Sequence, residues 1–417
     1  MDGFIEKRQM FYSQIDNFWH DISGEEYALL DIKKESVKNI ERLRLATEQI
    51  GHIFYKTAPL LRRLDNETFA RLGFPRETHA FLRLKTTPIE SVIARLDLVV
   101  MGDKIKLLEL NADTPTFIKE TFYVNGKVCD YFQMENPNAG YEEQLRKALL
   151  TAVTYCAPIK GSNIIFASHP DNEEDKHTTL YLKELLEIDS RYMDFNQLRI
   201  VNEPIIESRQ IILSPGLYDA NGNKIDLLYR QTYPIEHLIH DEDPLTKEKV
   251  GQMLMKLVEQ KELAILNPPS AFLLQSKAIM ALIWGLHEER HSFYTQEEHE
   301  IIERYFLATY LDPDEFLHKG QTYVKKPAFG REGDTVEIYS STGTKVAEDT
   351  HKTYQEELSV YQEFIELPQI DIQTVQGPKR AHYMYGSFYI NGEASAIGVR
   401  AGGQITDNTS YFLPIGI

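Results

Sequence analysis

The chain has 417 residues, 42% of them hydrophobic, which is enough for two or three domains with substantial cores and argues against disorder. Its 63 acidic against 45 basic residues give a formal net charge of −18, which disfavours nucleic acids and anionic membranes as partners. Cys129 and Cys156 lie outside any metal-ligand spacing, so we expect reduced thiols and neither a disulfide framework nor a structural zinc site.

Residues 24–63 carry apolar side chains at helical spacing among charged ones, which predicts one or two amphipathic helices. No run of about 18 uncharged apolar residues occurs, and residues 1–10 lack the basic-then-apolar pattern of a signal peptide. We therefore expect a cytoplasmic protein that has no membrane partner.

Two apolar strands joined by a tight turn are predicted in the stretch ARLDLVVMGDKIKLLELNADTP. Residues two apart in a strand share a face, so Arg95 lies beside Asp97 and Glu109 beside Asn111. A three-residue loop, 102–104, pairs Asp97 with Glu109 across the hairpin and the arginine with the asparagine. A two-residue loop would place the two acids on opposite faces.

Two carboxylates opposed at about 4.5–5.5 Å repel one another unless a cation lies between them. Mg²⁺ meets that need, because it binds one or two carboxylates and takes its other oxygen ligands from water and phosphates. The alternative is an exposed hairpin face on which Arg95, Lys104 or Lys106 balances the acids.

The middle of the chain alternates between helical and strand patterns. A helix near 141–155 leads to a buried strand at 163–168, and a second helix follows at 178–188. Strands at 210–215 and 224–231 complete an alternation that is typical of an α/β layer. We interpret this region as a domain inserted between two halves of another unit.

Residues 246–266 and 270–287 are predicted to be helical, with the prolines of NPPS separating them. Lys277 stands at the entry to the apolar stretch KAIMALIW, where the plain alternative is a surface lysine. From about residue 321 the pattern becomes rich in strands, and Asn391-Gly392 predicts a tight hairpin.

The segment TYVKKPAFGREGDTV combines two lysines with a glycine loop between strands. It is not a P-loop, because the GxxxxGKS or GxxxxGKT pattern is absent and no helix follows the glycines. A flexible glycine hairpin can still lie over phosphates, with Arg331 facing the anion and Lys326 reaching from the strand. A plain surface hairpin explains the same letters. YQEFIEL alternates as a strand that carries Glu363.

The segments LLELNADTP, YVKKPAFGREG, YQEF and GVRAGGQITDN, in that order, resemble the synthetase portion of the glutathionylspermidine synthetase family, an ATP-grasp ligase family. The resemblance runs from about residue 15 to the C-terminus, and its most specific element is R-x-D followed by E-x-N. The E-x-N pair precedes Lys277 and Lys326, an order that resembles the circular permutation seen in this family and in eukaryotic-type glutathione synthetases.

The resemblance implies an α/β (α+β) protein with a circularly permuted ATP-grasp fold and an inserted α/β substrate domain of the pre-ATP-grasp kind. Residues 1–417 would then form one synthetase unit. Within it we expect four regions: a metal-binding hairpin region at 85–125, the inserted domain at 145–265, a nucleotide lid with the glycine loop at 270–345, and the C-terminal part of the grasp core at 346–417.

The resemblance also implies roles for single residues. Arg95 would stabilise the acyl phosphate and the tetrahedral intermediate. Magnesium would be held by Asp97, Glu109 and Asn111. The residues implied to contact ATP are Lys277, Lys326, Gly330, Arg331, Gly333, Gln362, Glu363 and Arg400. Those implied to contact the other substrates are Thr114, Thr116, Glu174, Asp175, Thr232 and Glu236.

The expected activity is that of an ATP-dependent carboxylate–amine ligase that uses ATP and Mg²⁺ and forms an amide through an acyl phosphate. Its expected partners are a peptide carboxylate and a polyamine or another amine. Tryptophans usual in the family are replaced by Tyr233, Ile235 and His237, which leaves the substrates open. The chain begins directly in the synthetase portion, so we expect no amidase activity. The alternatives are a ligase for a different acid and amine, and an inactive nucleotide-binding protein.

Overall fold

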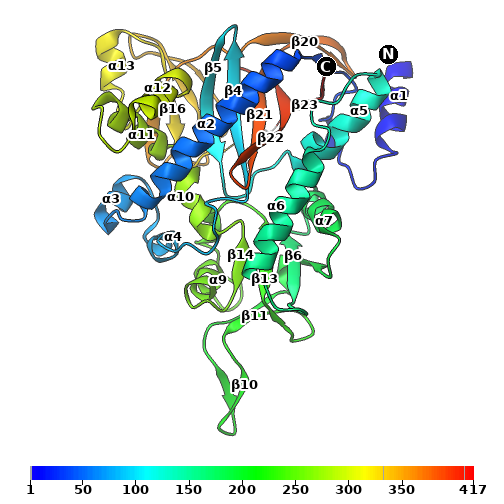
Figure 1. Ribbon diagram of the computed structural model, residues 1–417, viewed down its shortest axis with the longest axis vertical. Coiled ribbons are helices and arrows are strands. Elements are labelled where there is room, and N and C mark those ends of the chain that lie inside the picture. Colours follow the sequence, from blue (N-terminus) through cyan, green and yellow to red (C-terminus); the bar gives the residue numbers. More distant parts are fainter. Residues whose placement is uncertain (1, 332, 408) are drawn as a thin grey trace.

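The computed structural model describes residues 2–331, 333–407 and 409–417 of the chain. Two antiparallel sheets lie in the upper part of the molecule, and a parallel sheet packed against helices lies in the lower part (Figure 1). The expected α/β class with mixed helices and sheets is confirmed.

The larger antiparallel sheet, here called the core sheet, has the strand order β23-β22-β21-β4-β5, and β20 also pairs with β21. Its strands are β4 (Ile93–Met101), β5 (Lys104–Asn111), β20 (Gln369–Thr374), β21 (Gly377–Ile390), β22 (Glu393–Gly402) and β23 (Tyr411–Leu413). The predicted hairpin at Asn391-Gly392 joins β21 to β22, and both residues have the positive φ that a two-residue turn requires, 51° and 88°.

The β4–β5 hairpin pairs Asp97 with Glu109 as predicted, but its turn differs from the predicted one. Its turn has two residues, because Met101 pairs with Lys104, so the three-residue loop is wrong. A bulge with Leu108 as the extra residue then shifts the register by one. Asp97 therefore still pairs with Glu109, and this part of the prediction is confirmed.

A long helix, α2 (Val37–Leu61), covers one face of the core sheet (Figure 1). Ser36 caps its first turn by accepting a hydrogen bond from the backbone N–H of Asn39. Thr47 of this helix is hydrogen-bonded to Ser387 of β21 at 2.6 Å. Ser387 pairs with Leu96, and neighbouring strand residues alternate between faces, so Asp97 points away from the helix.

The segment before α2 is not helical after residue 12, so the helix predicted over 24–63 is wrong for its first part. The segment forms α1 (Asp2–Tyr12), β1 (Asp21–Ile22), β2 (Glu25–Glu26) and β3 (Lys33–Lys34). β3 pairs in parallel with β24 (Ile415–Gly416) at the far end of the chain. Local apolar spacing could not reveal this pairing, because its partner lies almost the whole sequence away.

The parallel sheet has the order β14-β13-β6-β7. Its strands are β6 (Ile164–Ser168), β7 (Arg191–Asp194), β13 (Leu227–Gln231) and β14 (Ala264–Leu266), and the main helices nearby are α6 (Tyr141–Cys156), α7 (Glu173–Leu186) and α9 (Val250–Glu259). β6, β13 and the first helix lie where the sequence predicted them, whereas β7 was not predicted. α7 begins earlier than predicted, because Asn172 caps it by accepting from the backbone N–H of Asp175.

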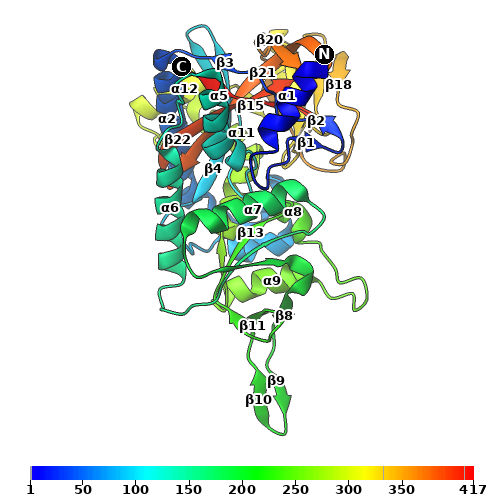
Figure 2. The same ribbon diagram turned by 90° about the vertical axis from the view of Figure 1, so that its right-hand side faces the viewer.

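Two predicted elements of this region differ from the structure. The helix predicted to residue 266 ends at Glu259, and β14 pairs with β13 instead. The strand predicted at 210–215 exists as β10 (Gln210–Leu213), but it pairs only with β9 (Ile205–Glu207) and projects from the body as an isolated hairpin (Figure 2). It therefore contributes nothing to the α/β layer.

Smaller elements connect these parts. They are α3 (Asn66–Arg71), η1 (Arg76–Thr78), α4 (His79–Leu82), the π-helix η2 (Glu120–Val124), α5 (Asn125–Phe132), η3 (Phe195–Gln197), β8 (Arg199–Val201), β11 (Gly216–Tyr218), β12 (Lys224–Ile225) and α8 (Ile235–Leu238). Strands β12, β11 and β8 form a small antiparallel sheet beside the parallel one.

The second antiparallel sheet, here called the lid sheet, has the order β15-β19-β16-β17-β18. Its strands are β15 (Thr309–Tyr310), β16 (Tyr323–Pro327), β17 (Glu337–Tyr339), β18 (Lys345–Glu348) and β19 (Ser359–Glu363), and its helices are η4 (Pro269–Ala271), α10 (Phe272–Gln275), α11 (Ala278–Glu288), α12 (Gln296–Tyr305) and α13 (Asp314–Lys319). Within the described ranges no single helix is long and apolar enough to cross a membrane, although the segments 269–275 and 278–288, bent by 59°, pass that test together.

Buried polar side chains fasten the β4–β5 hairpin to the parallel sheet. Asn267, directly after β14, accepts hydrogen bonds from the backbone N–H groups of Val92 and Ile93 at 3.0 Å each. Its amide also donates to the backbone carbonyl of Asp113 at 2.7 Å. Arg230 of β13 forms an ion pair with the carboxylate of Asp113, and both side chains are 0% exposed. These contacts fix the hairpin relative to the lower part of the molecule.

Replacing Asp113 with alanine should lower the free energy of unfolding by about 3–5 kcal/mol, because the guanidinium of Arg230 then stays buried without a counter-charge. Urea unfolding followed by circular dichroism measures the change. As a control, Glu67→Ala removes an exposed ion pair with Arg71 and should cost less than about 1 kcal/mol. Equal losses in the two variants would contradict the prediction.

Candidate active site

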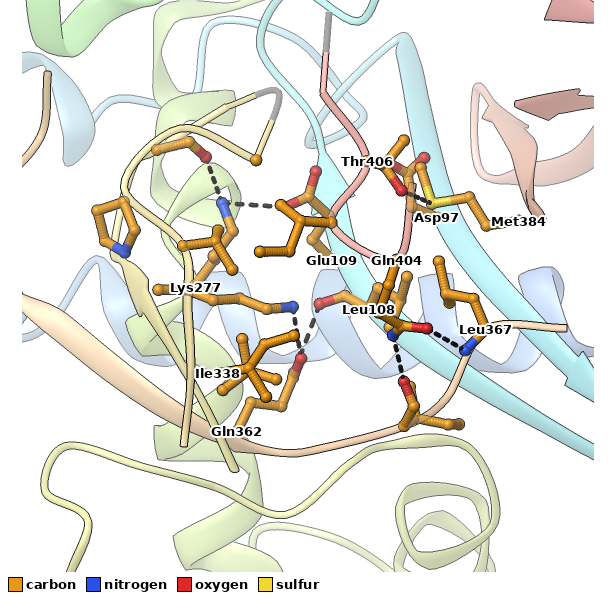
Figure 3. Close-up of a pocket in the computed structure, with 18 of the residues that line it drawn as sticks. Asp97, Leu108, Glu109, Lys277, Ile338, Gln362, Leu367, Met384, Gln404 and Thr406 are labelled. Carbon is orange, nitrogen blue, oxygen red and sulfur yellow. Dashed lines mark hydrogen bonds and ion pairs between the residues drawn. The ribbon is translucent and has the colours of Figure 1, made fainter. Parts of the chain in front are cut away.

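A cavity of about 780 Å³ lies between the core sheet and the lid sheet. One part of its wall is apolar and is made by Leu108, Val324, Val336, Ile338, Ile365, Leu367, Met384 and Ile405. The other part carries charged and amide side chains, among them Asp97, Glu109, Lys277 and Gln362 (Figure 3). This first cavity therefore suits a ligand with an apolar, flat end and a charged end.

Lys277 joins the two sheets at the charged end. Its ammonium lies 3.0 Å from the carboxylate of Glu109 on β5 and donates to the backbone carbonyl of Gly330 at 2.5 Å (Figure 3). Its backbone N–H donates to the carbonyl of Ala328 at 2.8 Å. The lysine that the sequence placed at the entry of an apolar helix is 5% exposed and points into the cavity, so it is not a surface lysine.

The charges in the cavity shift the pKa values of the neighbouring groups. Burial alone would raise the pKa of Glu109, but Lys277 and Lys326 outweigh it and hold the pKa at about 2. Burial lowers the pKa of Lys326 to about 8, against the opposing attraction of Glu109. The ammonium of Lys326 donates to the side-chain oxygen of Gln362 at 2.7 Å. The partner of Lys326 in this hydrogen bond is thus a neutral amide.

Arg95 and Asp97 form a buried pair on β4. The guanidinium donates to both carboxylate oxygens, at 2.8 and 3.1 Å, and also to the backbone carbonyl of Thr116 at 3.0 Å. Gly386 of β21 lies opposite Asp97, and a Cβ there would come within 3.0 Å of the arginine side chain. Burial raises the pKa of Asp97, although Arg95 opposes the shift.

These ion pairs weaken the charge argument for a metal ion. The sequence argument assumed that Asp97 and Glu109 need a cation from outside the chain. Instead Arg95 neutralises the first acid and Lys277 the second. The opposed carboxylates are explained by the protein's own cations, so a metal is not required to hold the hairpin together.

The donor set still fits Mg²⁺ in its chemistry. Asp97 and Glu109 both line the cavity, and two carboxylates with water and phosphate oxygens are a typical Mg²⁺ environment. Asn111 donates to Glu109 at 3.3 Å and accepts from Gln275 at 3.3 Å. Its oxygen would reach a cation beside Glu109 only after the amide turns over, and amide orientation is an assignment from hydrogen bonds. Among the described residues no group of three or more His, Cys, Asp and Glu side chains forms a metal site by itself.

The glycine loop lies between the cavity and a second one. Gly330 and Gly333 line the first cavity. At Gly333 φ is 70°, and a Cβ would come within 2.7 Å of the backbone of Thr406, so the loop approaches the C-terminal segment closely. Arg331 donates to the hydroxyl of Thr114 at 3.1 Å. Glu332, the remaining member of this loop, lies outside the described residues.

Gln362 and Glu363 end strand β19, and both line the cavity. Gln362 is buried and, besides accepting from Lys326, donates to the backbone carbonyl of Leu108 at 3.4 Å. Its position links the lid sheet to the bulge of the core sheet. The backbone N–H of Glu363 donates to the carbonyl of Ala308 at 2.8 Å, so its side chain alone is presented to the cavity.

A second cavity of about 1890 Å³ adjoins the first, and Arg400 lines both. Its acidic residues are Asp21, Asp171, Glu173, Glu174 and Asp175, and Thr116, Thr232, His169, Tyr233, His237 and Arg331 are also on its wall. Three of the acids stand in the first turn of α7, where carboxylates are favourable for any helix. Their position at a helix start therefore has a structural explanation of its own.

Thr232 and Glu236 differ in their position. Thr232 lines the second cavity, whereas Glu236 is buried behind the wall. Neither the hydroxyl of Thr232 nor the two carboxylate oxygens of Glu236 have a hydrogen-bond partner among the described residues. Burial raises the pKa of Glu236 to about 8, although Arg331 opposes the shift.

The predicted site residues thus divide between two cavities that share Arg400. Those on the first are Asp97, Glu109, Lys277, Lys326, Gly330, Gly333, Gln362, Glu363 and Arg400, and those on the second are Thr116, Glu174, Asp175, Thr232, Arg331 and Arg400. Arg95, Asn111, Thr114 and Glu236 are on neither wall, and Arg95 contacts Thr116, which lines the second cavity.

Sequence reasoning missed the residues that hold the site together and those that form its apolar wall. Gln275 accepts from the backbone N–H groups of Ala112 and Asp113 at 2.8 and 3.2 Å, directly after the acids of β5. A glutamine inside the apolar run AFLLQSKAIM was the available signal, since a buried amide needs partners. The apolar wall comes from segments far apart in the sequence and had no local signal.

Comparisons with known proteins found a family model, a curated relative and a solved structure that are similar to this chain. The family model described as "Glutathionylspermidine synthase preATP-grasp" matches residues 6–417. A curated protein of Haemophilus influenzae named "Putative acid--amine ligase" is 24% identical over 356 residues, which are 81% of this chain and 79% of that protein. A solved structure, "Putative gamma-glutamylcysteine synthetase" from Methylobacillus flagellatus, is 13% identical and has a TM-score of 0.45 over 87% of this chain and 88% of that one.

Lys326 should react with an amine-specific reagent at lower pH than exposed lysines do. At a pKa of about 8 roughly half of Lys326 is neutral and nucleophilic at pH 8, whereas an ordinary lysine is almost fully protonated. Hydrogen bonds to Glu348 and Glu337 raise the pKa of the exposed Lys345, which serves as the internal control. Peptide mass spectrometry after brief labelling measures both. Faster labelling of Lys345 at pH 8 would refute the assignment.

Proposed function

The chain belongs to the glutathionylspermidine synthase preATP-grasp family, and we propose that it is an ATP-dependent ligase that joins a carboxylate to an amine. One observation carries the proposal: a cavity with lysines and an apolar wall shares Arg400 with a larger cavity that has five carboxylates on its wall. The first suits a nucleotide and the second suits an amine, and the shared arginine marks the place where the two would react.

The first cavity supports ATP as the nucleotide. Its apolar wall offers the flat surface that a purine base needs, and Gln362 and Glu363 stand beside that wall. Lys277 and Lys326, on the charged part of the wall, supply positive charge for phosphate groups. The glycine loop with Arg331 lies over that part, where its backbone can approach an anion closely.

The reaction that fits this arrangement begins when a substrate carboxylate attacks the γ-phosphate of ATP. The carboxylate oxygen forms a bond to phosphorus, and the bond to the leaving ADP oxygen breaks. Lys277 and Lys326 stabilise the charge that moves toward ADP. The product is an acyl phosphate, whose carbonyl an amine then attacks.

Arg95 is placed to act on that carbonyl. Its guanidinium already contacts the carbonyl of Thr116, a residue of the second cavity. A fixed guanidinium stabilises the negative charge of an acyl phosphate and of the tetrahedral intermediate. Asp97 holds the arginine in place through two hydrogen bonds. This acid would therefore have two roles: it orients Arg95, and it would also bind a metal ion.

Mg²⁺ would be held by Asp97, Glu109 and, after the amide turns over, Asn111. Bound there together with ATP, it would neutralise charge on the phosphates. Lys277 would then exchange its contact with Glu109 for one with phosphate, since one carboxylate cannot serve both cations fully.

The acidic wall of the second cavity supports a cationic amine as the other substrate. Five carboxylates attract an amine with further positive charges, and a polyamine has that character. A ligase for another acid and amine would use the same machinery with a different second cavity. A nucleotide-binding protein without turnover is the alternative from another class.

A cytoplasmic location, the division into the four regions and the permuted ATP-grasp fold stay predictions.

Incubation with ATP, Mg²⁺, a pool of small peptides and a pool of amines should yield ADP and a new conjugate smaller by one water than its two parts. Mass spectrometry identifies the conjugate, and a coupled assay measures ADP. No ADP-coupled product from broad pools would reject the ligase and favour the nucleotide-binding protein.

Replacing Lys326 with methionine should lower kcat/KM for ATP by about 10²–10³, because a phosphate contact is lost. Lys325 provides a matched control: it is the neighbouring lysine of β16, points to the other face and lies 3.5 Å from Glu337. Lys325→Met should change kcat/KM by less than about threefold. A similar loss in both variants would contradict the assignment of Lys326.

A variant with Glu174→Ala and Asp175→Ala should raise KM for the amine and leave KM for ATP unchanged. The reason is the loss of two carboxylates from the second cavity while the first keeps its walls. Initial rates at varied amine and varied ATP separate the two constants. An unchanged KM for the amine would remove these residues from the amine site.

A further inference from the structure

A buried tyrosine and a buried glutamate meet at the edge of the second cavity. Tyr27 lines this cavity, is 8% exposed, and donates its hydroxyl hydrogen to Glu120 at 2.6 Å. Glu120 begins the π-helix η2 (Glu120–Val124) and is 0% exposed. Its second carboxylate oxygen has no hydrogen-bond partner among the described residues. Neither residue has a part in the function proposed above.

The pair lies at the reacting end of the cavity. Tyr27 shares the cavity wall with Arg400, which also reaches the first cavity, and with Thr116, whose carbonyl Arg95 contacts. The charged groups whose fields act on the pair are Lys119, Arg95, Glu174 and Arg400. Tyr27 therefore lies on the wall of the same cavity as Arg400 and the carboxylates that would hold an amine.

A structural role alone explains this pair poorly. Burying a carboxylate costs free energy unless its oxygens are hydrogen-bonded, and here one oxygen accepts from Tyr27 while the other has no partner among the described residues. Burial also raises the pKa of Glu120, with Tyr27, Lys119 and Arg95 opposing the shift. A carboxylate with a raised pKa is a stronger base, which is the property that a proton acceptor near neutral pH needs.

The proposed ligase needs such an acceptor. An alkylamine is protonated at neutral pH, and its ammonium form has no lone pair with which to attack a carbonyl. Asp97 and Glu109 of the first cavity already pair with Arg95 and Lys277, so these two acids are not available as bases. We propose that Tyr27 and Glu120 form a proton relay that deprotonates the amine substrate at the mouth of the second cavity. This inference rests on the proposed function.

The relay balances in protons and electrons. The ammonium gives one proton to the oxygen of Tyr27, while the tyrosine's own hydroxyl proton passes to Glu120. The freed nitrogen lone pair forms the bond to the acyl carbon, and the bond between that carbon and the phosphate oxygen breaks with its electron pair on phosphate. The nitrogen's second surplus proton leaves with the phosphate, and Glu120 returns its proton to solvent when the product departs.

Hydroxylamine separates this role from a structural one, because it is largely unprotonated at neutral pH and needs no base. The acid and the alkylamine in this assay are the pair that the conjugate screen described above identifies. If the wild-type protein couples no such pair, the result rejects the proposed function and not the relay. With the wild type active, Tyr27→Phe and Glu120→Gln should lower amide formation from the alkylamine at pH 7 by about 10²-fold or more. Hydroxamate formation from hydroxylamine should stay within about threefold of the wild-type rate.

The pH profile supplies a second readout. In both variants the rate with the alkylamine should rise with pH as the free amine becomes abundant, whereas the wild-type rate depends less on pH in that range. Tyr181→Phe is the matched control: Tyr181 is also 8% exposed and donates to Glu142 at 2.7 Å, but it lines neither cavity. This variant should leave both reactions unchanged.

Two results would overturn the relay. If Tyr27→Phe and Glu120→Gln lose hydroxamate and amide formation equally, the pair supports the structure and moves no proton. If both keep the alkylamine rate at pH 7, the pair has no part in the reaction. Glu120→Gln retains an oxygen that can accept from Tyr27, so the hydrogen bond that anchors the N-terminal segment is kept in that variant.

Discussion

The arrangement of the site depends on the pairing of Asp97 with Glu109 across one hairpin. Two carboxylates at neighbouring ladder positions would repel each other, and the fold answers this by bringing one cation to each of them. Arg95 comes from the same strand, and Lys277 comes from the entry of a helix on the other side of the cavity. The second contact is what joins the lid sheet to the core sheet, because Lys277 also binds the glycine loop through Gly330.

The pairing of each carboxylate with a cation stabilises the site, and the same cations can bind a charged ligand. Breaking a buried ion pair costs free energy, because it leaves one charge buried without a counter-charge. A lysine or arginine that turns from its carboxylate toward a phosphate therefore has to be replaced by another cation. In the proposed function, a divalent cation arriving with the nucleotide would be such a replacement for Lys277. Arg95 keeps additional contacts to Thr116, so it need not leave Asp97 to act on a substrate carbonyl.

The parallel sheet positions the hairpin of the first cavity, but none of its described side chains lies on the wall of that cavity. Asn267 and Arg230 hold the ends of the hairpin by buried hydrogen bonds and one ion pair, and Gln275 holds the residues after β5. The lower part of the molecule then supplies the acidic wall of the second cavity through the start of α7. Arg400 lines both cavities, so small movements between the two parts of the molecule would change the distance between the two substrates.

The sequence by itself determined the local elements and the shared face of the acids, because alternation in a strand and spacing in a helix are properties of neighbouring residues. It predicted the hairpin at Asn391-Gly392, the two central strands of the parallel sheet, β6 and β13, and the pairing of Asp97 with Glu109. The pairing of Asp97 with Glu109 nevertheless arises from a two-residue turn followed by a bulge at Leu108. The residues of the turn alone do not reveal that the bulge restores the register. Only the tertiary structure decided that Arg95 and Lys277 neutralise the acids, that Glu236 lies behind the cavity wall, and that Tyr27 meets Glu120. These contacts join residues up to about 170 positions apart, and a linear pattern carries no information about such distances.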